Sequence, residues 1–313
     1  MQIASVSKST TGFWSGIALV IVGAILLSAK GILSKMLYAE GLDFQEVITF
    51  RSVLSLPLFW LWAIYSLGLN KLVNISDGRA VVGAIGAGVF CYYIGGSLDF
   101  YALTLIDASL ERVLLYTYPA VIVIGTCLWA RRKPGTNILI ALVMTYAGII
   151  LTIGVFDMSL WKENSLGSVL VLTCAITYGA YYIANDLIGQ RIGSVVFTVY
   201  AMTSATVALC IHFSLTHSIS DIVSLTPRSW YLFLIMVVFV TVVPLFMLAE
   251  GVKQIGAQRA SLLSTVGPAS TIILATIFLG ESMQWFQYLG VLITLAGIVI
   301  LEWKQKPPEA LSD

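Results

Sequence analysis

Residues 145–149 read Thr-Tyr-Ala-Gly-Ile, and residues 294–298 read Thr-Leu-Ala-Gly-Ile. The two stretches lie 149 residues apart, and the same offset brings Pro119-Ala120 onto Pro268-Ala269. Apolar segments match by chance at single positions, so the argument rests on the prolines and the Ala-Gly-Ile run sharing one register. Such self-similarity at a fixed offset predicts a chain built from two related halves.

The composition places these halves in a membrane. Of the 313 residues 58% are hydrophobic and only 11% are charged, against roughly 25% charged residues in a soluble domain. A bilayer span needs about 20 apolar residues and must satisfy its own backbone hydrogen bonds, so we predict helices. The sequence lacks the alternating polarity of barrel strands. Ten segments qualify: 13–37, 44–68, 80–104, 108–130, 136–155, 166–187, 194–213, 229–252, 257–279 and 284–303.

Two related halves of five helices each have opposite orientations, because five is an odd number. The predicted fold class is therefore an all-α integral membrane protein with ten transmembrane helices arranged as two inverted five-helix repeats. Inverted repeats are typical of alternating-access transporters. The predicted organisation is a cytoplasmic N-terminal tail at 1–12, a first repeat at 13–155, an external linker at 156–165, a second repeat at 166–303 and a cytoplasmic C-terminal tail at 304–313.

The loop charges predict the orientation. With the N-terminus inside, eleven Lys and Arg residues fall on the inner side and four on the outer side, as the positive-inside rule requires. Both termini are thus expected in the cytoplasm, and the protein in the cell (inner or plasma) membrane as a multi-pass protein. A net charge of +1 gives no indication of nucleic-acid binding.

Several stretches carry a resemblance to a known family. They are Ser28–Lys35, the Arg-Ser-Val-Leu-Ser-Leu-Pro run at 51–57, Tyr-Thr-Tyr-Pro at 116–119, the run from Gly256 to Pro268, and Leu-Gly-Glu at 279–281. With these the chain resembles the drug/metabolite transporter superfamily, of the EamA-like ten-helix type, over about residues 13–303. Arg132 departs from the pattern, because this family commonly has an acidic residue after the fourth helix.

The resemblance implies a helix bundle with a central cavity that opens in turn to each side. The predicted function is secondary transport of a small metabolite (an amino acid or similar amphipathic solute) across the cytoplasmic membrane by alternating access, with export favoured. The alternatives are a membrane channel and a non-transporting structural or receptor-like membrane protein. An enzyme is not expected, because the sequence has neither a GxxxxGK[ST] loop nor an HExxH motif.

Candidate substrate-binding residues come from two signals. Each matched proline lies near the middle of its predicted helix, where it removes a backbone hydrogen bond and kinks the helix. Paired irregularities of this kind in corresponding spans are the best sequence pointer to a midplane site. Tyrosines on the third and sixth spans offer stacking area with a polar tip. The alternatives are kinks that only shape packing, and aromatic packing between helices. The candidates are Tyr92, Tyr93, Tyr116, Tyr118, Pro119, Tyr178, Tyr182, Ser264, Thr265, Gly267 and Pro268.

Charges within or near the spans are the candidates for gating or coupling. An ionisable residue in a span is costly and is expected to face protein or water. We expect Asp99 to pair with Lys30 or Arg51 near an outer entrance, whereas a snorkelling lysine is the alternative for Lys30. Towards the inner side, Glu250 and Arg259 are candidates for a second gate or for proton coupling, and solvated helix ends are the alternative.

The remaining polar residues predict neither a cofactor nor a metal site. The four cysteines lie inside apolar runs without a CxxC partner, and only two histidines exist, so we expect packing roles for the cysteines. The expected partners are a small-molecule substrate and the lipid bilayer. The sequence leaves open proton coupling and the choice between a monomer and a homodimer.

Overall fold

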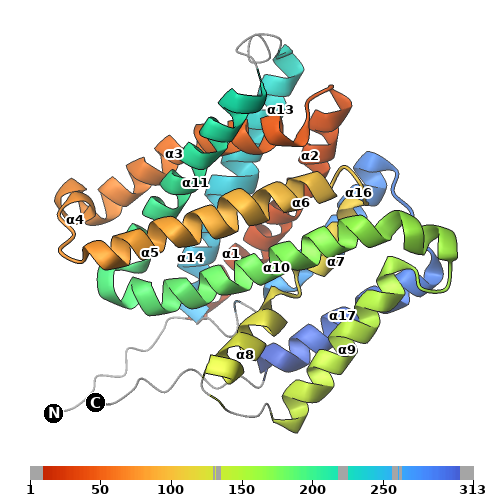
Figure 1. The fold of residues 1–313 in the computed structure, drawn as a ribbon. Coiled ribbons are helices and arrows are strands. Elements are labelled where there is room, and N and C mark those ends of the chain that lie inside the picture. The colour runs from red at the N-terminus through yellow and green to blue at the C-terminus, as the bar shows by residue number, and fades with distance from the viewer. Residues whose placement is uncertain are drawn as a thin grey trace.

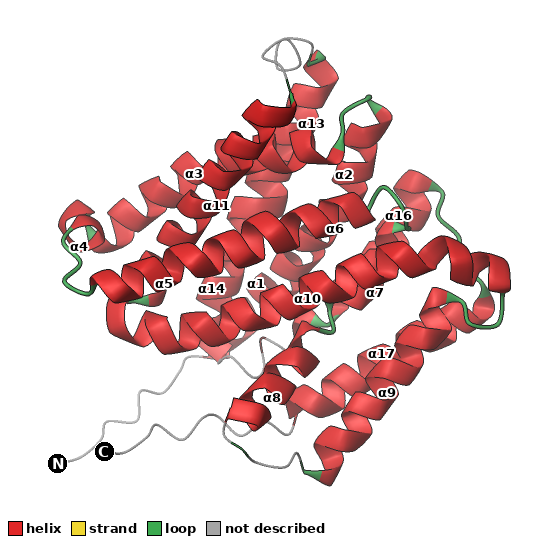
Figure 2. Cartoon of the chain, in the orientation of Figure 1, coloured by secondary structure: helices red, strands yellow, loops and turns green. Residues whose placement is uncertain are grey.

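The computed structural model describes residues 10–129, 131, 135–217, 225–255, 260 and 263–303, and this part of the chain is helical without a strand (Figure 2). In chain order the helices are α1 (Thr10–Ser28), α2 (Lys30–Ala39), α3 (Phe44–Leu67), α4 (Leu69–Val73), α5 (Gly78–Gly88), η1 (Val89–Gly95), α6 (Gly96–Ala102), α7 (Ala108–Leu115), α8 (Tyr118–Trp129), α9 (Thr136–Ile153), α10 (Met158–Ile192), α11 (Ser194–Thr216), α13 (Pro227–Val237), η2 (Val238–Val242), α14 (Val243–Ile255), α16 (Val266–Leu279) and α17 (Trp285–Trp303).

Local sequence signals decide where these helices begin and end. Asp43 and Glu46 form a capping box at the start of α3, in which each side chain accepts a hydrogen bond from the other residue's backbone N–H. Thr226 caps α13, with Pro227 in the first turn. Gly154 and Gly280 end α9 and α16 in the left-handed conformation that glycine adopts most readily.

The described helices have the length and polarity of an integral membrane protein. Seven are long and apolar enough to cross a bilayer, and three shorter apolar helices cover Ile138–Ile153, Val266–Leu279 and Trp285–Ile300. All ten overlap the segments marked in the sequence, whereas the count of ten complete spans stays a prediction. Large apolar side chains are exposed on the surface, as lipid contact requires; examples are Leu61, Leu128, Ile277, Phe278 and Leu292.

The helix α10 is longer than the sequence indicated. It begins at Met158, capped by Asp157, and runs without interruption to Ile192. Residues 158–165, which we expected in an external linker, therefore form its first turns. In Figure 1, α10 crosses the molecule beside α5 and α6, and it also packs against α8 and α11.

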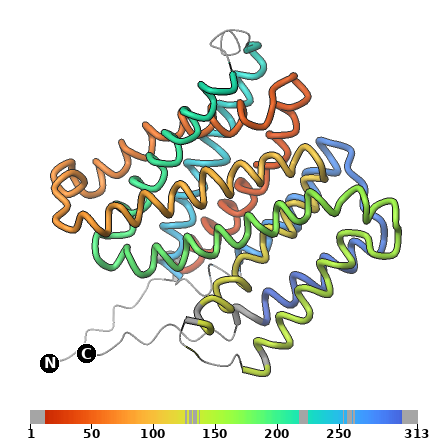
Figure 3. The backbone as a smooth tube through the Cα atoms, viewed as in Figure 1, coloured from red at the N-terminus to blue at the C-terminus, as the bar shows by residue number. Residues whose placement is uncertain are grey.

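The fifth and tenth segments pack against each other over their whole length. α9 and α17 run side by side at one edge of the bundle (Figure 3). A Cβ atom on Gly148 would lie 2.6 Å from the Gly290 carbonyl oxygen, and one on Gly297 would lie 2.8 Å from the Ala141 carbonyl oxygen. Small residues thus allow close backbone approach, and the same 149-residue offset relates Gly148 to Gly297 and Ala141 to Gly290.

Irregular backbone also recurs at this offset. The π-helical turns η1 and η2 begin at Val89 and Val238, 149 residues apart. In the fourth segment α7 ends before Thr117, and in the ninth a turn at Thr265 precedes α16. The inverted relation of the two halves stays a prediction.

The matched prolines need one correction. We interpreted Pro119 and Pro268 as kinks in the middle of continuous helices. Instead, the helices are interrupted, and each proline lies in the first turn after the break, in α8 and α16. The missing N–H of proline costs nothing there, because the first turn has no intrahelical acceptor for it.

Candidate substrate-binding cavity

A cavity of about 290 Å³ lies in the interior of the helix bundle. Its volume is at the low end of the roughly 300–1,000 Å³ range of small-molecule pockets. The lining combines apolar side chains with hydroxyls and cations from both halves of the chain. It includes Leu27, Lys30, Arg51, Ser52, Ser55, Phe59, Tyr92, Arg112, Tyr116, Tyr118, Tyr178, Tyr182, Thr198, Met202, Thr241, Leu248 and Ser264.

The helix breaks position one wall of this cavity. The Tyr116 hydroxyl lies at the α7–α8 break and donates a 2.7 Å hydrogen bond to the Ser264 carbonyl oxygen, just before the other break. The Ser28 hydroxyl, at the end of α1, lies 2.8 Å from the Gly267 carbonyl oxygen. Backbone groups freed by interrupted helices thus find partners on neighbouring segments, as they must inside a membrane.

Tyrosines form the aromatic part of the lining. The rings of Tyr118 and Tyr182 stack at 5.2 Å between centroids with an interplanar angle of 11°. Tyr92 meets Tyr178 and Tyr181 edge-on, at centroid distances of 6.1 Å and 4.9 Å. These rings offer flat apolar faces and hydroxyl groups to a bound solute.

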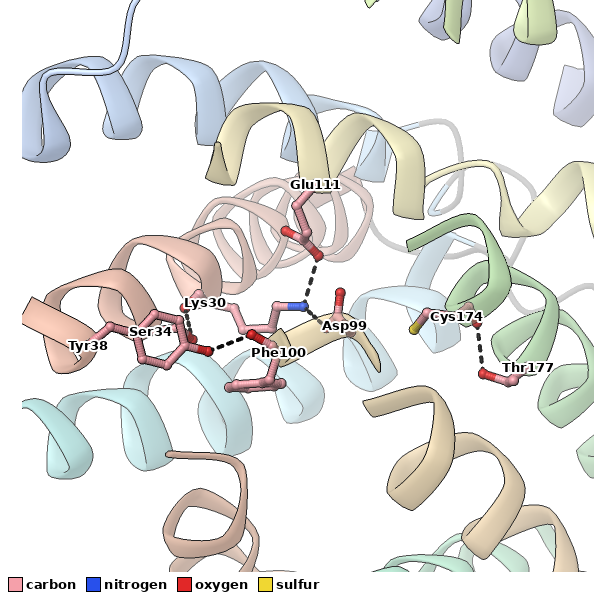
Figure 4. Close-up of polar contacts among 8 residues, drawn as sticks. All are labelled: Lys30, Ser34, Tyr38, Asp99, Phe100, Glu111, Cys174 and Thr177. Atoms are coloured by element: carbon pink, nitrogen blue, oxygen red, sulfur yellow. Dashed lines mark hydrogen bonds and ion pairs between the residues drawn. The ribbon is translucent and has the colours of Figure 1, made fainter. Parts of the chain in front are cut away.

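Lys30 is the centre of a buried ion cluster at the start of α2. Its ammonium group is hydrogen-bonded to Asp99 of α6 and lies 3.0 Å from a carboxylate oxygen of Glu111 of α7. Figure 4 shows the ammonium between the two carboxylates. The pair of Lys30 with Asp99 that we expected from the sequence is therefore present. We call Lys30, Asp99 and Glu111 the buried ion cluster.

Two arginines face the cavity beside this cluster. The Arg51 guanidinium lies 5.0 Å from the centroid of the Phe100 ring, and that of Arg112 lies 5.2 Å from the centroid of the Tyr116 ring. Arg112 is 8% exposed. The Nε atoms of both arginines are buried and have no hydrogen-bond partner within the described residues. Arg51 does not pair with Asp99, which was the other pairing that the sequence left open.

A second polar cluster connects the loops on the side that we predict to be external. The Glu281 carboxylate accepts hydrogen bonds from the backbone N–H groups of Ala108 and Ser109, at 2.8 and 3.1 Å, and from the Ser109 hydroxyl. It therefore caps the N-terminus of α7 from the other half of the chain. Lys35 lies 3.3 Å from Glu281 and 3.4 Å from Asp107. We call these contacts the external clasp.

Six of the predicted substrate-binding residues line the cavity, and five do not. Tyr93 lies with its hydroxyl 3.3 Å from His212 instead. Gly267 and Pro268 are buried near the break that shapes the wall, and Pro119 and Thr265 lie at the two breaks. The lining residues are Tyr92, Tyr116, Tyr118, Tyr178, Tyr182 and Ser264.

Of the candidates for gating or coupling, two line the cavity and the other described ones do not. Lys30 and Arg51 line the cavity, and Asp99 binds Lys30 behind it. Glu250 is exposed, with a 3.2 Å hydrogen bond from Gln254, and does not line the cavity. Arg259 lies outside the described residues.

The sequence interpretation missed three residues that the fold brings into these clusters. Glu111 and Arg112 are charged residues within an apolar span, which is by itself a signal for a functional site, but we counted Arg112 with the external loops and passed over Glu111. Glu281 was quoted only as part of a family motif. Among the described residues, no group of three His, Cys, Asp or Glu side chains is arranged to hold a metal ion.

Fold and site together define a multi-pass α-helical membrane protein with a polar, tyrosine-lined internal cavity. The sequence model of the EamA-like transporter family matches residues 14–154 and again residues 165–303. The chain therefore belongs to the EamA-like transporter family, within the drug/metabolite transporter superfamily, and it is a membrane protein of the transporter class.

Similar proteins carry the same general designation. The uncharacterized transporter YcbK of Bacillus subtilis is 31% identical over 88% of this chain and 89% of its own length. The uncharacterized transporter sll1319 of Synechocystis is 24% identical over 94% of both chains. A solved crystal structure, 14% identical, superposes with a TM-score of 0.61 over 92% of this chain and 96% of the other, which shows a shared fold.

Proposed function

We propose that this protein is a secondary transporter that carries a small amphipathic metabolite across the cytoplasmic membrane by alternating access. The observation that carries the proposal is the internal cavity, whose lining comes from both halves of the chain and combines tyrosines with cations. A site between two structural repeats, beside interrupted helices, is the arrangement that secondary transporters use.

The external clasp supports a role in closing one side of the cavity. It joins Glu281, near the end of the ninth segment, to the start of α7 and to Lys35 of α2. These contacts are between groups from different halves, so a rocking motion of one half against the other would break them. We infer that the clasp holds the external side closed in this conformation, and that the release of Glu281 accompanies opening to that side.

Counterflow in proteoliposomes tests the proposal, because exchange of labelled against unlabelled solute needs no knowledge of the driving force. Liposomes preloaded with an unlabelled solute are placed in the labelled solute, using a panel of amino acids and aromatic carboxylates. We expect transient accumulation that saturates with concentration. A linear, non-saturating flux would favour a channel, and a folded protein that moves no member of the panel would contradict the proposal.

Direction and coupling need two further arms of the same experiment. We expect export, the direction that the sequence analysis favoured, and uptake into inside-out vesicles measures it. An imposed pH gradient then separates proton-coupled transport, which the gradient accelerates, from exchange or facilitated transport, which it leaves unchanged. For proton coupling, the buried ion cluster offers two carboxylates close to the cavity.

A further inference from the structure

The cavity lining is unbalanced in charge. Three cationic side chains line it, from Lys30, Arg51 and Arg112, and the described lining includes no Asp or Glu. The carboxylates of Asp99 and Glu111 bind the Lys30 ammonium. No described residue forms an ion pair with either arginine, and the three cations stand against only two carboxylates, so the site has one excess positive charge.

Burial makes this imbalance significant. Arg112 is more than nine-tenths buried, and its Nε has no hydrogen-bond partner within the described residues. An unpaired charge in a low-dielectric interior costs several kcal/mol as an order of magnitude, and a cation–π contact with Tyr116 recovers only about 0.5–2 kcal/mol. A further group that accepts hydrogen bonds and carries negative charge would offset the rest.

The tyrosines of the lining indicate the apolar part of the ligand. The stacked rings of Tyr118 and Tyr182 and the edge-on pair of Tyr92 and Tyr178 lie on the same cavity. Flat rings of this kind bind planar apolar groups through their faces. A guanidinium group binds the oxygens of a carboxylate through its fork of N–H donors.

We propose that the transported solute is an organic anion, with a carboxylate held by Arg51 and Arg112 and a planar apolar body held between the tyrosines. This inference rests on the transport function proposed above and names its substrate class. The ammonium group of an amino acid finds no carboxylate on the described lining, so the ligand needs no positive charge of its own.

Three probes of the same shape test the charge: 3-phenylpropanoate, 3-phenylpropanamide and 3-phenylpropylamine. Binding of each to the purified protein in nanodiscs is measured by equilibrium dialysis at neutral pH. We expect the anion to bind about tenfold or more tightly than the neutral amide, the ratio that one charge-assisted hydrogen bond produces, and the amine to bind most weakly. Equal binding of the three probes, tighter binding of the amine, or no binding of the anion to folded protein overturns the proposal.

Variants locate the binding site. Arg112→Gln and Arg51→Gln are expected to lower the affinity for 3-phenylpropanoate about tenfold each while leaving the amide unchanged. Arg112→Lys keeps the charge and is expected to retain part of the preference. Lys71→Gln removes an exposed cation that does not line the cavity and serves as the control. Unchanged anion preference in both glutamine variants overturns the assignment to these arginines.

The outcomes separate this inference from the proposed function. Binding of the anion without counterflow would keep the anion site and contradict the carrier. Saturable counterflow of neutral or cationic solutes, without preference for the anion, would keep the carrier and contradict the anion site.

Discussion

The two halves of this protein share a backbone plan but differ in charge. In both, a π-helical turn interrupts the third helix of the half, at Val89 and at Val238, and the fourth helix is broken just before a proline. The last helices of the halves meet through glycines at matched positions. The buried ion cluster and both cavity arginines, however, lie in residues 13–155 alone.

The matched positions of the second half make this difference concrete. With the 149-residue offset, Asp99 corresponds to Leu248, Glu111 to Ala260 and Arg112 to Ser261. In the proposed alternating-access cycle, a common backbone plan suits two halves that rock against each other. The charges therefore give the cavity a polarity that the backbone does not have. In the proposed transporter the first half binds the anionic group of the solute, and tyrosines of both halves bind its apolar body.

Replacing the central cation of the first half is expected to have the largest effect. Lys30→Met leaves the carboxylates of Asp99 and Glu111 buried together without a cation, and breaking a buried pair in this way costs about 3–5 kcal/mol. We expect a large loss of thermal stability in detergent and a loss of counterflow. The triple variant Lys30→Met, Asp99→Asn, Glu111→Gln is expected to recover stability but not transport.

A carboxylate of the second half provides the control. Asp186→Asn removes an exposed charge on α10, and we expect wild-type stability and transport. If Lys30→Met proves as stable as the wild type, or Asp186→Asn as damaging as Lys30→Met, the division of charges between the halves has no functional meaning.

The glycines test the shared part of the comparison. Because added Cβ atoms at Gly148 and Gly297 would crowd backbone oxygens on the facing helix, each alanine variant is expected to lose about 1–3 kcal/mol by overpacking. The two losses should be similar, since the positions are related by the repeat. Gly86→Ala, where a Cβ meets nothing within 4 Å, is the control. Unfolding in detergent measures the stability of all three variants. A loss of stability at only one of the two matched sites would show that the halves are not equivalent at this contact.

The external clasp gives the smallest expected effect. Glu281→Gln turns an amide NH₂ towards N–H donors, so at least one of its hydrogen bonds is lost. We expect up to about tenfold more of the outward-open state, which corresponds to ~1.4 kcal/mol. Maleimide labelling of a Ser52→Cys reporter from the external side, in a Cys210→Ser background, measures the change. Unchanged labelling would show that the external clasp does not control opening to the external side.

Asp107→Asn is the matched variant in the same cluster, and the direction of the pKa shift of Asp107 decides the result that we expect. Burial and the nearby Glu281 carboxylate raise the pKa of Asp107 above its usual value of 3.8. The ionised form is thus disfavoured in the folded state, and this penalty is present above the raised pKa and relieved as the pH falls through it. Asp107→Asn is therefore expected to leave the clasp closed, and increased labelling would contradict this reading.

The sequence by itself determined the membrane class, the placement of the apolar segments, the residue matches at an offset of 149, and five tyrosines and one serine of the cavity lining. These follow from hydropathy, length and matched residues, which are local properties of the chain. It also indicated that Asp99 would pair with Lys30 or Arg51, because a charge within an apolar span needs a partner, and the structure shows the pair with Lys30.

Only the tertiary structure decided which charges share the cavity. Glu111 and Arg112 are adjacent in the chain, yet one binds Lys30 and the other faces the cavity. Glu281 caps a helix 172 residues before it in the chain, and the prolines follow helix breaks that local sequence did not distinguish from kinks. The physical reason is that the burial and pairing of a charge depend on the packing of segments far apart in sequence, whereas hydropathy reports each segment alone.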